Sequence, residues 1–197
     1  MSNSRISILV KSIKEIKNWM IPVAYYFGLK QGKKIVNFKN GIQCIIRNKF
    51  DAIAFYENFF METNCPSDLM SIKKNDIVID IGAHVGYFTL YASNIAKEGK
   101  IYAFEPTNQT YQILEQNIKL NNLKNVEITN SGVSDHVGTA TLYFDEENSI
   151  SNSMFISNNK KIEKIKVTNI SKIIEDNHIN KINLLKLDCE GAEFLIL

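Results

Sequence analysis

The sequence lacks several features that would point to particular classes of protein. Its 197 residues include three cysteines, none in a C-x-x-C pair, and three histidines without the spacing of metal ligands. We therefore expect no disulfide framework and no metal site, and reduced thiols suit a cytoplasmic protein. Lysine and arginine number 23 against 21 acidic residues, so the chain lacks the basic excess typical of nucleic-acid-binding domains. We expect no nucleic-acid partner.

The N-terminal region has no hydrophobic run long enough to span a membrane. Trp19–Leu29 is free of charge for eleven residues, against about 20 for a transmembrane helix. Ile6–Val10 is too short for the core of a signal peptide. Because lysines flank both segments, one interpretation is a helix in peripheral contact with a membrane surface. The favoured interpretation is a helix that packs on the domain as a cap.

The composition, 45% hydrophobic and 22% charged, is that of a globular protein. Residues 1–70 are predicted to form an extension of helix, β-hairpin and helix, with Ile35–Phe38 and Ile42–Ile46 as the hairpin strands. Residues 71–197 are predicted to form an α/β domain with a mostly parallel sheet, because strand and helix patterns alternate there. The expected strands of this domain are Ile77–Ile81, Ile101–Phe104, Val126–Asn130, Thr139–Phe144, Lys164–Val167 and Ile182–Leu187.

The segment Asp76–Gly86, DIVIDIGAHVG, carries the strongest functional signal. A buried strand ends at Asp80, a turn with Gly82 and Gly86 follows, and a helix pattern begins at once. This arrangement holds nucleotide-like cofactors at the carboxyl edge of parallel sheets. Glu105 ends the next strand, at a distance typical of an acid that binds a ribose diol.

The turn does not suit a dinucleotide. His84 stands where the middle glycine of G-x-G-x-x-G would be, and an acid before the turn would repel a pyrophosphate. S-adenosylmethionine, with a sulfonium, an amino group and a ribose, fits both Asp80 and Glu105. An NAD-dependent or nucleotide-sugar enzyme is the weaker alternative.

Five segments of the sequence, the first of which contains the glycine turn, resemble the FkbM-type S-adenosylmethionine-dependent methyltransferases. The matching segments are DIGAHVGYFTLYAS (80–93), AFEP (103–106), LEQNIKLNNLKNV (114–126), SGVSDHVG (131–138) and LLKLDCEGAEF (184–194). The resemblance implies a Rossmann-like class I methyltransferase sandwich. It further implies methyl transfer, usually to a hydroxyl of a small-molecule or glycan acceptor.

The resemblance also implies roles for individual residues. Asp188 and Glu190 would lie near the methyl group and the acceptor, where either could serve as general base, with His84 as the next candidate. Simpler interpretations are helix capping for the two acids and a turn position for His84. The implied cofactor-binding residues are Asp80, Gly82, Ala83, His84, Gly86, Glu105, Ser134 and Asp135.

The chain ends in four apolar residues, Phe194 to Leu197, within an expected helix. Chain ends normally lie in water, so we expect a protein truncated at its C-terminus, with the last strands of the family fold missing. Two functional hypotheses follow: an O-directed methyltransferase, or a non-catalytic remnant that binds cofactor weakly or serves as an interaction module.

Overall fold

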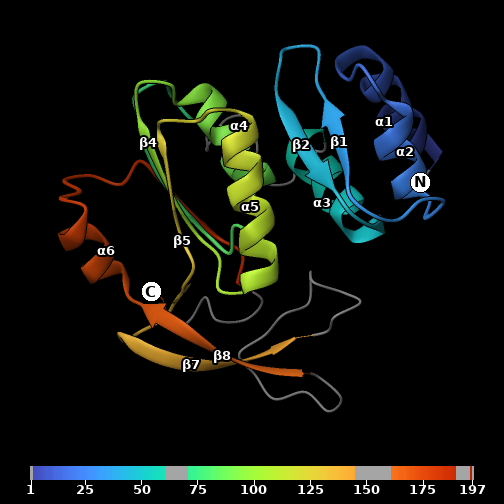
Figure 1. Cartoon of the computed structure of the whole chain (residues 1–197). Coiled ribbons are helices and arrows are strands. Elements are labelled where there is room, and N and C mark those ends of the chain that lie inside the picture. Colours follow the sequence, from blue (N-terminus) through green and yellow to red (C-terminus); the bar gives the residue numbers. More distant parts are fainter. Residues whose placement is uncertain (1, 61–70, 145–160, 190–195, 197) are drawn as a thin grey trace.

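The computed structural model describes residues 2–60, 71–144, 161–189 and 196, which form an α/β fold (Figure 1). The N-terminal extension consists of α1 (Ser2–Glu15), α2 (Met20–Tyr26), β1 (Lys34–Asn37), β2 (Gln43–Ile46) and α3 (Lys49–Phe59). β1 and β2 pair as an antiparallel hairpin with Val36 opposite Cys44, as the sequence predicts. Gly41, at φ +98°, occupies the turn, where a left-handed conformation suits glycine.

The central sheet has four parallel strands in the order β5-β4-β3-β9. Its strands are β3 (Ile77–Ile81), β4 (Lys100–Phe104), β5 (Val126–Thr129) and β9 (Leu184–Leu187). The helices that accompany it are α4 (Tyr87–Ile95), α5 (Asn108–Leu120) and α6 (Ile170–Asp176). In Figure 1, α4 and α5 lie on one side of the sheet and α6 on the other. Strand order reverses between β3 and β9, and such a point is where open α/β sheets bind ligands.

The two-residue period of β3 decides which side chains face which helices. Ile79 packs in the cluster that contains Ile173 of α6, whereas Val78 packs in the cluster that contains Phe88 of α4. Asp80 is two residues after Val78 and therefore points to the α4 side of the sheet. An acidic side chain is thus buried under a helix, where it needs partners.

A second, three-stranded sheet lies beyond the carboxyl edge of the central sheet (Figure 1). Its strands, in the order β6-β8-β7, are β6 (Gly132–Val133), β7 (Gly138–Phe144) and β8 (Lys161–Thr168). β7 forms one edge of this sheet and includes the strand expected at Thr139–Phe144.

The N-terminal extension shares a core with the helices of the sheet. Phe55 of α3 and Ile45 of β2 are buried in one cluster with Tyr87 of α4. The Tyr87 hydroxyl donates to the carbonyl of Ile45 at 2.7 Å. Asn117 of α5 accepts from the amide of Ile45 and donates to the carbonyl of Val85, both at 2.8 Å. The extension is therefore fastened to the turn that follows β3.

The first helices have one buried side and one exposed side. Ile8 and Ser12 of α1 are buried, and the Ser12 hydroxyl lies 3.0 Å from the hydroxyl of Tyr56. Across the described ranges, no helix combines the length and the apolar character needed to cross a membrane.

Candidate functional site

Asp80 lies at the carboxyl end of β3 and is fully buried. The hydroxyl of Thr89, on α4, donates to one of its oxygens at 2.6 Å. Lys186 of β9 lies with its Nζ 3.3 Å from the other oxygen. The sheet register explains this pair, because Asp80 and Lys186 are directly opposite each other on neighbouring strands. Both oxygens of the buried carboxylate thus have a partner.

Lys186 also bridges to a second acid. Its Nζ lies 3.3 Å from an oxygen of Asp188, whose side chain is 61% exposed. Burial opposes the charge of Lys186, but the two carboxylates raise its pKa above the ordinary value. Two acids and one lysine leave this group with a net charge of −1 when all three are ionised.

The turn after β3 approaches the end of β9 closely at Gly82. This residue has φ +76°, and a Cβ built on it would overlap the carbonyl oxygen of Asp188. The amides of Gly82 and Ala83 both donate to the carbonyl of Phe104, at 3.0 and 2.9 Å. The turn therefore joins the carboxyl ends of three strands, β3, β4 and β9.

The same turn is bonded to the acid that ends β4. His84 adopts φ +53°, and its amide donates to Oε2 of Glu105 at 2.8 Å. The Glu105 Oε1 accepts from the amide of Thr107 at 2.9 Å and from the hydroxyl of Thr110 at 2.7 Å. Burial raises the pKa of Glu105, although these hydrogen bonds favour its charged form. The side chain of Thr107 adds a fourth hydrogen bond, so the donors match the roughly four acceptor positions of a carboxylate.

The imidazole of His84 stays neutral at physiological pH. Burial is the main cause that lowers its pKa to about 4; the negative charge of Asp51 raises the pKa and the positive charge of Arg47 lowers it, both by smaller amounts. Arg47 binds Asp51 through two hydrogen bonds of 2.8 Å, and Asp51 is fully buried. This ion pair comes from the N-terminal extension, so the extension contributes charged groups beside the turn. This pair was not predicted from the sequence, although an arginine and an aspartate four residues apart were a signal.

Gly86 is the N-cap residue of α4 with φ +88°, and a Cβ there would overlap Cδ1 of Leu114 on α5. This glycine therefore allows α4 and α5 to pack closely where α4 begins.

The remaining predicted site residues stand apart from this network or outside the described residues. Ser134 is buried after β6, and its hydroxyl donates to Asp135 at 3.0 Å. Asp135 is exposed and hydrogen-bonded to His136 at 2.7 Å, and this bond lowers the pKa of Asp135. The hydrogen bonds described for Ser134 and Asp135 do not reach Glu105. Glu190 lies outside the described residues.

Glu57 of α3 is a second charged residue near the site that was not predicted from the sequence. Burial raises the pKa of Glu57, and the negative charge of Asp188 raises it further. The extension thus places an acid near the exposed carboxylate at the end of β9. No local pattern indicated this, because α3 and β9 are far apart in the chain.

Comparison with known proteins places this arrangement in a family. Residues 80–197 match the family model of the methyltransferase FkbM domain. The chain belongs to the FkbM methyltransferase family. The FkbM domain begins at Asp80 and includes the glycine turn, Glu105, Lys186 and Asp188.

Two curated relatives are methyltransferases by name. Methyltransferase sdnD of Sordaria araneosa is 26% identical over 181 residues, which cover 76% of this chain and 69% of the relative. Methyltransferase 1 of Beauveria bassiana is 26% identical over 152 residues, 66% of this chain and 60% of the relative. The crystal structure of methyltransferase FkbM from Methylobacillus flagellatus superposes with a TM-score of 0.48 at 16% identity. That match covers 72% of this chain and 32% of the crystallised one.

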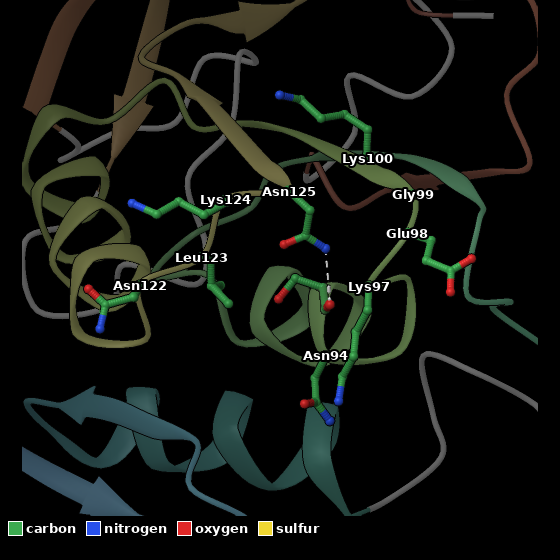
Figure 2. A pocket seen from close by; sticks show the side chains of 10 residues that line it. Asn94, Lys97, Glu98, Gly99, Lys100, Asn122, Leu123, Lys124 and Asn125 are labelled. Atoms are coloured by element: carbon green, nitrogen blue, oxygen red, sulfur yellow. Dashed lines mark hydrogen bonds between the residues drawn. The ribbon is translucent and has the colours of Figure 1, made fainter.

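A hollow of about 500 Å³ lies at the opposite, amino edge of the FkbM domain's sheet (Figure 2). Asn125 closes part of it by donating to the carbonyls of Ser93 and Ala96 at 3.1 and 2.9 Å. The lysines around it, Lys97, Lys100 and Lys124, point in different directions (Figure 2). They form no convergent set of cations, so the carboxyl edge remains the candidate site.

Proposed function

We propose that this FkbM-family chain transfers a methyl group from S-adenosylmethionine to a hydroxyl of a small molecule or a glycan. Family membership over residues 80–197 supports the reaction class. The observation that carries the proposal is the bond from the His84 amide to Glu105, which makes the glycine turn and the second acid one unit. Such a unit can hold a ribose and the group attached to it at the same edge of the sheet.

The described residues fit this cofactor. Asp80, Lys186 and Asp188 together carry a net charge of −1, which favours a cation over an anion at the end of β3. Glu105 is held at the carboxyl end of β4 beside the turn, where an acid that binds a ribose diol is expected. Gly82 keeps the space beside the main chain of Asp188 free of a side chain. We extend the cofactor-binding set to Ala83, His84 and Gly86 of the turn and, beyond β6, to Ser134 and Asp135.

When bound, S-adenosylmethionine supplies a methyl group on a positively charged sulfur. The protein has to align the acceptor oxygen with that group, an orientation effect of up to about 7–11 kcal/mol. We assign Asp188, together with Glu190, to the acceptor side as proton acceptors. The carboxylate of Asp188 is exposed and is held by Lys186, so it can meet an incoming hydroxyl.

We also propose that residues 1–70 form a distinct extension and that residues 71–197 form the cofactor-binding domain. The extension would support the domain through the Asn117 hydrogen bonds and through the Arg47–Asp51 pair beside His84. A cytoplasmic location is part of the same proposal.

Titration calorimetry with S-adenosylhomocysteine tests the cofactor assignment. Asp80→Asn should weaken binding by about tenfold or more, because it removes the charge that makes the group at the end of β3 net negative. Asp176→Asn is the control, because Asp176 lies in an exposed pair with Lys172 on α6. An absence of binding to the unmodified chain would contradict the proposal. Equal affinity in both variants would contradict the role of Asp80.

The acceptor class needs a separate experiment. The chain is incubated with donor labelled in the methyl group and with mixed monosaccharides, oligosaccharides and small alcohols. Label is expected in O-methyl ethers, which resist alkali. Binding of the donor without transfer would support the non-catalytic alternative, and label in alkali-labile esters would show a carboxylate acceptor.

A further inference from the structure

Exposed apolar side chains are concentrated in the N-terminal extension. Nine large hydrophobic residues are exposed among the described residues, and seven of them lie between positions 9 and 35. These seven are Leu9, Val10, Ile13, Met20, Phe27, Leu29 and Ile35. Such clustering in a globular fold marks an interaction surface, whereas single exposed apolar residues do not.

The outer face of α1, defined here as Leu9, Val10 and Ile13, is one part of this surface. Successive residues of an α-helix are about 100° apart, so these three side chains fall within an arc of about 100°. They are 39%, 57% and 45% exposed. The opposite face of the helix carries the buried Ile8 and Ser12. α1 therefore packs on the protein with one side and carries aliphatic side chains on the side that faces away.

The second helix repeats this pattern. Met20 at the start of α2 and Phe27 just after its end are seven residues apart, which places them on one face of the helix. They are 66% and 53% exposed, and the nearby Leu29 is 74% exposed. Figure 1 shows α1 and α2 together on the far side of the hairpin from the central sheet. A partner bound there would leave the central sheet uncovered.

The first 50 residues of the extension, which end just after α3 begins, differ in the sign of their charge from the rest of the chain. The first 50 residues contain ten lysines and arginines and one acid, Glu15, a net charge of +9. The other 147 residues contain 13 basic and 20 acidic residues, a net charge of −7. The near-neutral total hides a strongly basic segment, and such an asymmetry points to an anionic partner.

We propose that the outer face of α1 docks on an anionic membrane surface. The apolar side chains would enter the boundary between headgroups and acyl chains, and the surrounding lysines would contact acidic headgroups. Lys14, whose side chain is 79% exposed, borders the apolar arc, and Lys17 follows the helix. At 14 residues, α1 is about 21 Å long, which suits a helix lying in the plane of the surface.

Two other occupants fit less well. A nucleic acid would satisfy the lysines but would offer little to three adjacent aliphatic side chains. A second copy of the chain would bury the aliphatic side chains but would bring two segments of charge +9 together, which is unfavourable. A surface that is both apolar and negatively charged matches both features.

Co-sedimentation with vesicles tests the proposal without reference to methyl transfer. Vesicles of phosphatidylcholine with phosphatidylglycerol should bind the chain, and vesicles of phosphatidylcholine alone should bind it at least about tenfold more weakly. The variant Leu9→Ser/Val10→Ser/Ile13→Ser should lose binding. The control Val137→Ser/Ile162→Ser replaces residues of similar exposure, 54% and 65%, outside the extension and should bind normally. Circular dichroism verifies that both variants fold.

A charge variant separates the two contributions. Lys14→Gln/Lys17→Gln should lower binding to the anionic vesicles by about tenfold or more, because each lysine near a membrane contributes about 1 kcal/mol. Equal loss of binding in the control variant, or no binding to anionic vesicles, would overturn the proposal. So would a dimer in solution that the α1 variant converts to monomer.

Discussion

The carbonyl oxygen of Asp188 occupies the space that a side chain at Gly82 would need. Gly82 is also in the left-handed region at φ +76°, which is unfavourable for residues with a Cβ. The turn that begins the proposed cofactor site therefore depends on glycine for two independent reasons. This contact fixes the end of β9, with its acid, against the end of β3.

Gly82→Ala should lower the free energy of unfolding by about 3 kcal/mol or more, from left-handed strain of about 1–2 kcal/mol plus overpacking. The matched control is Gly32→Ala, because Gly32 has φ +87° and a Cβ added there would meet no atom within 4 Å. The control should show the strain alone, about 1–2 kcal/mol. Urea denaturation measures both variants. Equal losses would show that the turn and β9 do not make this contact.

Lys186→Met should destabilise the protein strongly, because it leaves the buried Asp80 without its ion-pair partner. Removal of one member of a buried pair typically costs about 3–5 kcal/mol. Lys172→Met is the control, because its ion pair with Asp176 is exposed and should contribute under about 1 kcal/mol. Adding Asp80→Asn to Lys186→Met should recover much of the loss. No recovery would show that the lysine acts through packing on Phe88 instead.

The elements around the site were predictable because their signals are local. Ile77–Ile81 is the strand β3 that the sequence predicted, since a short apolar run ending in an acid and glycine is typical of a buried parallel strand. The hairpin formed as predicted because Asn-Gly favours a tight turn. Predicted and observed ends differ by a few residues, for example at β9, which begins at Leu184 and not at Ile182.

The partners of the acids were not predictable in the same way. Lys186 meets Asp80 only because β9 lies next to β3 in a particular register, and that order is set by long-range contacts. Glu57 comes near Asp188 only because α3 packs with the helices of the domain. The acids were predicted from the sequence to attract a cation, whereas the structure shows that a lysine already neutralises part of their charge.

His84 should make the protein less stable in mild acid. Its pKa is lowered to about 4 in the folded protein, from an ordinary value of 6.5. Between these values the unfolded chain binds a proton that the folded chain does not, so stability falls as pH decreases from about 6.5 to about 4. His84→Asn keeps a residue that tolerates the left-handed conformation but removes this titration.

Urea midpoints of the original chain and of His84→Asn, measured from pH 7.5 to 4.5, test this expectation. As the pH falls below 6.5, the urea midpoint of the original chain should decrease steadily relative to that of His84→Asn. Glu105 titrates in both proteins and largely cancels in the comparison. If the urea midpoints of the two proteins changed in parallel with pH, the imidazole would be accessible to protons in the folded state.

We expect the side chain of Asn117 to hold the N-terminal extension against the turn that follows β3. It is fully buried and holds the amide of Ile45 and the carbonyl of Val85 at once. Asn117→Ala leaves both main-chain groups unsatisfied and should cost about 2–4 kcal/mol. The surface variant Asn94→Ala should change stability by less than about 0.5 kcal/mol. Hydrogen exchange at the Ile45 amide should accelerate more than exchange in β4, and unchanged protection at Ile45 would show that the extension is held without this bond.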